Sequence, residues 1–163
     1  MSQGARHWQL GLIGLGVIIA SYLTLLHYDS QIPLVCSSHG FVDCESVLTS
    51  PESTWVGVPV SLFGWAWFVA YGVTLLARPR AVWIRRGLAM AGAATVLYLV
   101  YVEFVELGQI CLWCSSLHII ILSLFGIELD QWSRWQESLG HANFANEQRP
   151  TASRKSSGHS ESL

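Results

Sequence analysis

Four long apolar stretches dominate the sequence and decide which folds are open to it. They run from Leu10 to His27, from Val58 to Ala77, from Trp83 to Val105 and from Gln109 to Leu129. A helix of about 20 residues crosses the hydrocarbon of a bilayer, and glycine and alanine recur along the first three stretches, which favours close helix packing in lipid. Only 12% of the residues are charged, against about a quarter in soluble domains. The sequence therefore predicts an all-α, multi-pass integral membrane protein in which four transmembrane helices form a bundle.

The positive charges all fall on one side of this four-span arrangement. Arg6 precedes the first span, four arginines lie around the link between the second and third, and every other Lys and Arg follows the fourth. By the positive-inside rule both termini are cytoplasmic, and the loop at 28–57 and the link near 106–109 are extracytoplasmic. We therefore expect a membrane domain at 1–130 with an outer loop at 28–57. The polar residues 131–163 have the composition of a disordered cytoplasmic tail.

All four cysteines lie on the predicted outer side of the membrane. Cys36 and Cys44 are in the outer loop, and Cys111 and Cys114 begin the fourth span. Disulfides persist in the periplasm, outside the cell and in the lumen of the endoplasmic reticulum, so we expect disulfide chemistry. A zinc site with four thiolate ligands is the alternative. The net charge of −2 gives no reason to expect a nucleic-acid partner.

The outer loop contains a predicted short helix at DCESVL, residues 43–48. Asp43 suits its N-cap, and Pro51 favours an end by Ser50. Cys36 and Cys44 would lie about 12 Å apart on a straight helix, so a disulfide between them needs a turn, for which SSHG at 37–40 is suitable. Such a bond could brace the loop or exchange with other thiols, and the sequence leaves both readings open.

The C-x-x-C pair lies where water meets the fourth span. Residues three apart share a helix face, so Cys111 and Cys114 can pair, and this spacing is typical of redox-active dithiols. Cys111 is expected at the water edge and Cys114 about 4.5 Å deeper, facing the bundle or the lipid. This placement suits electron transfer from water-side thiols to a carrier dissolved in the membrane. A quinone fits best, since it accepts the two electrons and two protons that one dithiol yields. Half of a zinc site and a purely structural bond are the alternatives.

Other residues are candidates for the quinone site. His118 continues the face of Cys114 one turn deeper, and an ionisable group inside a span is a candidate functional residue; it could donate a hydrogen bond to a quinone oxygen. Trp55, Phe63 and Trp65 could line a flat aromatic ligand. Each has an ordinary alternative, because histidines are often packed in cores and aromatic residues gather at membrane interfaces.

The order of these motifs resembles the vitamin K epoxide reductase family. The residues that carry the resemblance are the spaced loop cysteines with DCESVLTS at the second, GVPVSLFGWAWF at the start of the second span, and CLWC at the start of the fourth. The resemblance implies a four-helix bundle around a quinone, either ubiquinone or a menaquinone/vitamin K type. It also implies that Cys111 and Cys114 form the active-site disulfide, with Cys114 nearest the quinone, and that Cys36 and Cys44 shuttle electrons to it.

Two positions distinguish this chain from the animal enzymes of that family. Val60 stands where those enzymes have an asparagine that bonds a vitamin K oxygen, and His118 stands where they have a tyrosine. Val60 is thus expected to face the quinone, and both differences weigh against epoxide reduction.

The GVPVSLFG stretch resembles the prokaryotic branch, whose members reduce quinones while making disulfides in exported proteins. The resemblance implies a location in the prokaryotic inner membrane, or in the endoplasmic reticulum membrane of a eukaryote. Because the chain is short for a fused thioredoxin-like domain, the expected partner is a separate thioredoxin-fold thiol oxidase, alongside membrane lipid and quinone. The alternatives are reduction of vitamin K or its epoxide on the same scaffold and, less favoured, a non-catalytic membrane protein braced by disulfides.

Overall fold

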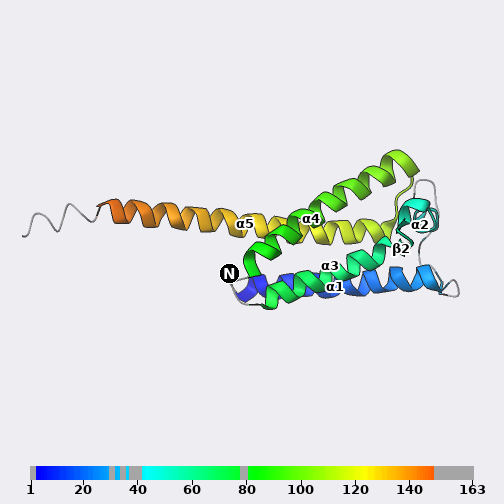
Figure 1. Cartoon of the computed structure of the whole chain (residues 1–163), viewed down its shortest axis with the longest axis horizontal. Coiled ribbons are helices and arrows are strands. Elements are labelled where there is room, and N and C mark those ends of the chain that lie inside the picture. The colour runs from blue at the N-terminus through cyan, green and yellow to red at the C-terminus, as the bar shows by residue number, and fades with distance from the viewer. Residues whose placement is uncertain (1–2, 30–31, 34–35, 37–41, 78–80, 149–163) are drawn as a thin grey trace, which may run out of the picture. The chain divides into compact units, whose positions relative to one another are not determined.

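The computed structural model describes residues 3–29, 32–33, 36, 42–77 and 81–148. The chain divides into two compact units, Met1–Gly126 and Ile127–Leu163. Helices make up most of the described chain (Figure 1): α1 Gln3–Tyr28, α2 Cys44–Leu48, α3 Val60–Leu76, α4 Val82–Tyr101, the π-helical segment η3 Val102–Leu107, and α5 Leu112–Gln148. Between α2 and α3 lie the short 3₁₀ helix η1 Pro51–Ser53 and the strands β1 Thr54–Trp55 and β2 Val58–Pro59.

Three helical segments of the described chain are long and apolar enough to cross a membrane. They are Gly4–Tyr28, Val82–Leu107 and Leu112–Glu147. The predicted second span corresponds to α3, which is apolar but has only 17 residues and is shorter than these three segments. Pro59 is the N-cap of α3, and Ala77, which has an extended backbone, ends it. The fold is that of an all-α membrane protein, with three apolar segments of spanning length and one shorter apolar helix where we predicted four spans.

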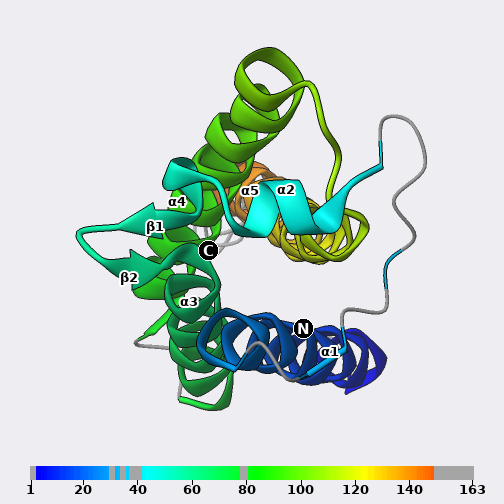
Figure 2. The same cartoon turned by 90° about the vertical axis from the view of Figure 1, so that its right-hand side faces the viewer.

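Four helices of the first unit contribute to one apolar core: α1, α3, α4 and the first part of α5 (Figure 2). Gly16 lets α1 approach α3 so closely that a Cβ there would lie 2.4 Å from the Phe68 ring. The Trp67 side chain donates a hydrogen bond of 2.9 Å to the Leu88 carbonyl and so ties α3 to α4. Buried residues from all four helices complete the core, among them Ile13, Leu23, Ala89, Leu117 and Leu124.

The predicted loop helix is confirmed. Asp43 is the N-cap of α2, and its carboxylate accepts a hydrogen bond of 3.1 Å from the Ser46 N–H. Val47, on the inner face of α2, is buried. The predicted turn at 37–40 lies outside the described residues.

A small β-hairpin lies between α2 and α3. We did not predict this hairpin from the sequence. β1 and β2 pair antiparallel, and the two turn residues Val56 and Gly57 have φ values of 52° and 77°. Positive φ at both central positions is the requirement of a tight hairpin turn. The hairpin leads directly from the outer loop into α3.

The chain beyond residue 130 differs from the expectation of a disordered tail, since α5 continues as one helix to Gln148. No proline interrupts residues 131–148, and Arg134 forms an ion pair of 2.8 Å with Asp130 one turn earlier. Such i,i+4 pairs support a polar helix. Residues 149–163 lie outside the described part of the chain.

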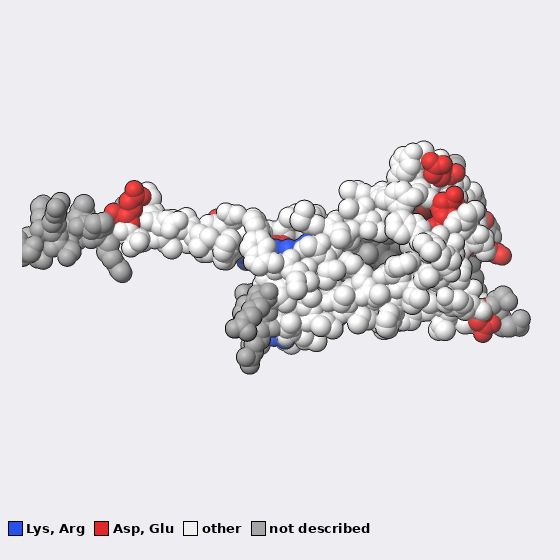
Figure 3. Space-filling view, in the orientation of Figure 1, with Lys and Arg blue, Asp and Glu red and all other residues white. Residues whose placement is uncertain are grey.

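Charged side chains segregate along the first unit. Asp and Glu gather at the end that carries α2, whereas Arg lies at the opposite end of the helices (Figure 3). Arg85 and Arg86, which we assigned to the link between spans, belong to the first turns of α4. Arg85 is buried there, and the Arg86 guanidinium lies 5.3 Å from the centre of the Trp83 ring, so the helix accommodates both cations.

Candidate active site

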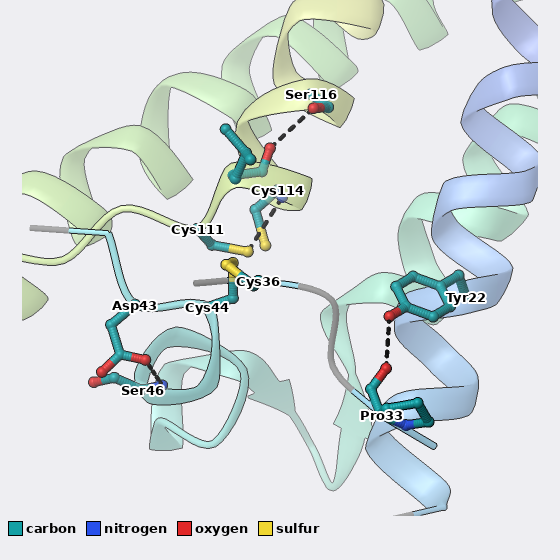
Figure 4. The surroundings of a disulfide bond; sticks show 10 residues. Tyr22, Pro33, Cys36, Asp43, Cys44, Ser46, Cys111, Cys114 and Ser116 are labelled. Atoms are coloured by element: carbon teal, nitrogen blue, oxygen red, sulfur yellow. Dashed lines mark hydrogen bonds between the residues drawn. A yellow bond between two sulfur atoms is a disulfide. The ribbon is translucent and has the colours of Figure 1, made fainter. Parts of the chain in front are cut away.

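The four cysteines come together at the acidic end of the first unit. Cys36 and Cys44 form a disulfide with a Cα–Cα distance of 6.2 Å, while Cys111 and Cys114 are free thiols. All four pack in one cluster around Val47. Figure 4 shows the sulfur of Cys111 directed toward the disulfide, with the sulfur of Cys114 beside it. The structure therefore brings together the two pairs that the sequence singled out.

A backbone bridge aligns the outer loop with the start of α5. Val42 and Ile110 form an isolated parallel bridge, and the Asp43 N–H donates a hydrogen bond of 3.2 Å to the Ile110 carbonyl. Cys44 follows Asp43 and Cys111 follows Ile110, so the bridge holds these two cysteines against each other. Sequence reasoning missed it because a single bridge has no periodic pattern.

Cys111 caps α5. Its sulfur accepts a hydrogen bond of 3.2 Å from the Cys114 N–H, and its carbonyl accepts one of 2.8 Å from the Ser115 N–H. These are the bonds of an N-cap residue, so Cys111 precedes the membrane-spanning helix.

The electrostatic surroundings of Cys111 favour its ionised form. The pKa of the Cys111 thiol is lowered from its ordinary value, mainly because the Cys114 side chain hydrogen-bonds to it. Burial and the charge of Glu103 act in the opposite direction, while the backbone N–H groups of Cys114 and Trp113 lower the pKa further. Because the thiolate is the nucleophile in disulfide exchange, Cys111 is suited to attack or to leave a neighbouring disulfide.

Accessibility differs within each pair. Cys44 and Cys111 are buried, with exposed fractions of 1% and 0%. The expectation that Cys111 lies at the water edge was therefore wrong, because α2 and the start of α5 pack over it. Cys36 and Cys114 are both partly exposed, and Cys114 lines a cavity that Cys36 does not reach. Each pair thus has one buried cysteine and one partly exposed cysteine.

The cavity beside Cys114 has a volume of about 350 Å³. Its wall is largely apolar and includes the flat rings of Trp55, Phe63, Trp67 and Tyr98, while the few polar side chains on it include Ser61, Thr95, Glu103 and His118. This volume and this composition are typical of sites for small organic ligands.

Five of the six residues that we considered for the quinone site line this cavity: Cys114, His118, Phe63, Val60 and Trp55. Trp65, which we also considered, does not line it. The spacing explains the difference, since Phe63, Gly64 and Trp67 share one face of α3 and Trp65 lies on another.

Several residues of the wall were not predicted from the sequence, among them Tyr98 and Glu103. Tyr98 contacts Trp55, with ring centres 6.2 Å apart. Glu103 is 5% exposed and lines the cavity from η3. The wide turns of η3 follow a regular helix, and no local sequence signal marks such a change.

The described residues include no group of three or more His, Cys, Asp or Glu side chains that could hold a metal ion. The Cys36–Cys44 disulfide also occupies two of the four sulfurs that a four-thiolate zinc site would need.

Long apolar helices and two adjoining cysteine pairs, one of them a disulfide, are the features of an integral membrane redox protein. Residues 7–129, from α1 into α5, match the vitamin K epoxide reductase family. The match covers most of the chain, which therefore belongs to this family.

Proposed function

We propose that this protein takes electrons from the thiols of an extracytoplasmic thioredoxin-fold partner and passes them to a membrane quinone, so that it supports disulfide-bond formation. The observation that carries the proposal is the single cluster of four sulfurs, because its last member, Cys114, lines an apolar cavity. Neither a loop-bracing disulfide nor a lone C-x-x-C would require this arrangement.

The accessibility of the sulfurs gives the order of the thiol steps. A partner thiolate attacks Cys36, the accessible member of the loop pair, and releases Cys44; the partner's second thiol then completes its own disulfide and leaves the loop pair reduced. Cys44 attacks Cys111 of the active-site disulfide and releases Cys114. Cys36 next attacks Cys44, which closes the loop disulfide again and releases Cys111. Each exchange breaks one S–S bond and forms another, and two electrons move inward.

The redox state of the four cysteines fits one point in this cycle. A closed Cys36–Cys44 disulfide beside free Cys111 and Cys114 is the state expected after the loop pair has delivered its electrons. The pair at α5 must then close to a disulfide for the next turnover, and this is the step that needs an acceptor in the cavity.

The residues of the cavity fit a quinone head group of the ubiquinone or menaquinone type. A quinone supplies an acceptor for two electrons and two protons. The rings of Trp55, Phe63 and Trp67 offer flat apolar surfaces, and Val60 keeps the start of α3 apolar. His118 is buried on the same wall and can donate a hydrogen bond to a ligand oxygen.

We further propose that the cysteine cluster faces the extracytoplasmic side and that both termini are cytoplasmic. The segregation of Arg and acidic side chains along the first unit supports this orientation through the positive-inside rule. The GVPVSLFG stretch supports a place in the prokaryotic branch, and therefore in a cell membrane.

Quinone reduction by purified protein tests the proposal. A reduced thioredoxin-fold protein is the electron donor, and the Cys111→Ser and Cys114→Ser variants are compared with the wild type. Both variants should lose turnover, and vitamin K epoxide should not be reduced by the wild type. Wild-type turnover in either variant would refute the relay, whereas epoxide turnover would assign the chain to the epoxide-reducing activity of its family.

A further inference from the structure

A buried acidic side chain lies on the wall of the cavity beside Cys114. Glu103 is 5% exposed, and it lines the cavity that Cys114 and His118 also line. Its negative charge opposes ionisation of the Cys111 thiol and so acts to raise the pKa of that thiol. Within the described chain, no hydrogen bond or ion pair to another side chain holds its carboxyl group.

Burying a carboxyl group without a partner is costly, and ionisable residues inside membrane spans commonly serve a function. The backbone of Glu103 is also fixed in an unusual way. It belongs to the π-helical segment η3, its carbonyl accepts a hydrogen bond of 3.1 Å from the Gln109 N–H, and Gly108 closes the segment with a φ of 60°. π-Helical turns frequently occur at functional sites.

Other titratable side chains also lie on the cavity wall. His27 and Glu52 are exposed, and His118 lies one turn deeper than Cys114. Of the two carboxyl groups on this wall, Glu52 and Glu103, only Glu103 is buried.

We propose that the Glu103 carboxylate carries protons between the cysteine cluster and the cavity, accepting a proton from a cysteine thiol and donating it to an oxygen of the bound quinone. This inference rests on the proposed function. When the Cys111–Cys114 disulfide closes, two S–H bonds break, one S–S bond forms, and two electrons and two protons go to the acceptor. Glu103 accepts one proton, donates it and is then free to carry the second.

Two near-isosteric variants on the same segment test this role. Glu103→Gln removes the proton carrier, and Glu106→Gln is the matched control, because Glu106 is exposed on η3 and does not line the cavity. Quinone turnover should fall at least about 100-fold in Glu103→Gln, the lower end of what acid–base groups supply. It should stay at the wild-type level in Glu106→Gln and recover in part in Glu103→Asp.

Two readouts without quinone separate proton transfer from a structural role. Thiol–disulfide exchange between the loop pair and the active-site pair should persist in Glu103→Gln. Infrared difference spectra, recorded as a soluble disulfide oxidises the α5 pair, should contain a carbonyl band of a protonated carboxyl group in wild type and in Glu106→Gln, and lack it in Glu103→Gln.

Any of three results in Glu103→Gln would overturn the inference: a carbonyl band unchanged from wild type, quinone turnover within about threefold of wild type, or a loss of thiol–disulfide exchange between the two cysteine pairs. These outcomes differ from failure of the proposed function, in which the cysteine variants themselves would keep quinone turnover.

Discussion

The contact of α1 with α3 at Gly16 gives a sharp test of the packing that surrounds the cavity. A Cβ at this position would lie 2.4, 2.5 and 2.7 Å from three atoms of the Phe68 ring. Phe68 has no exposed surface, and its ring is held edge-on against Trp67 with the ring centres 5.1 Å apart. The ring cannot move aside freely, so Gly16→Ala should overpack the core.

The expected magnitude follows from two opposing effects. Overpacking a well-packed core costs about 1–3 kcal/mol, whereas replacing glycine by alanine within a helix contributes up to about 1 kcal/mol of stability. Gly14→Ala isolates the second effect, because a Cβ at Gly14 would meet no atom within 4 Å. Gly16→Ala should therefore be about 1–3 kcal/mol less stable than Gly14→Ala. This difference corresponds to an unfolding equilibrium constant that is about 5-fold to 150-fold larger.

Reversible unfolding in detergent, followed by circular dichroism, measures this difference. Adding Phe68→Leu to Gly16→Ala should recover part of the loss, because the clashing ring atoms are then gone, and a double-mutant cycle gives the coupling. If Gly16→Ala proves as stable as Gly14→Ala, α1 and α3 do not approach as closely as the structure has them.

Three further outcomes concern the site. Because the hydrogen bond from Cys114 lowers the pKa of Cys111, attack of the Cys111 thiolate on the Cys36–Cys44 disulfide, the reverse of the delivery step, should level off at a lower pH than attack by an ordinary cysteine thiol; stopped-flow rates that rise with pH as far as those of a free cysteine would contradict this. Val60→Trp should fill part of the cavity and raise the KM for quinone about 10-fold, a loss of about 1.4 kcal/mol. Val69→Trp, on the exposed side of α3, should leave the KM unchanged, and an equal rise would disprove the cavity assignment. His118→Phe should weaken quinone binding about 2- to 10-fold, as for one lost hydrogen bond, and unchanged affinity in equilibrium titration would remove His118 from the quinone site.

Local sequence signals predicted much of the fold because each has a direct physical cause. Long apolar stretches require burial in lipid or in a core, and they predicted α1, α3, α4 and the first part of α5. The Asp43 carboxylate next to free N–H groups gave the start of α2. The apolar stretch at 58–77 predicted a full span, yet proline at its start shortened the helix to 17 residues. Apolarity alone does not set where a helix begins.

The site was predictable only in part. The spacing of Cys111 and Cys114 indicated redox chemistry, and the depth of Cys114 indicated the cavity side. The bridge between Val42 and Ile110 and the burial of Glu103 depend on contacts between distant segments. Such contacts leave no periodic trace in the chain, so only the structure brings them out.

The order in which the two disulfides form tests the central claim most directly. Fully reduced protein is mixed with one equivalent of quinone, quenched at successive times with an alkylating reagent, and mapped by peptide mass. We expect the Cys111–Cys114 bond to close first and the Cys36–Cys44 bond to follow at its expense, with no loop oxidation in Cys111→Ser. Loop oxidation at the wild-type rate in that variant would contradict the relay.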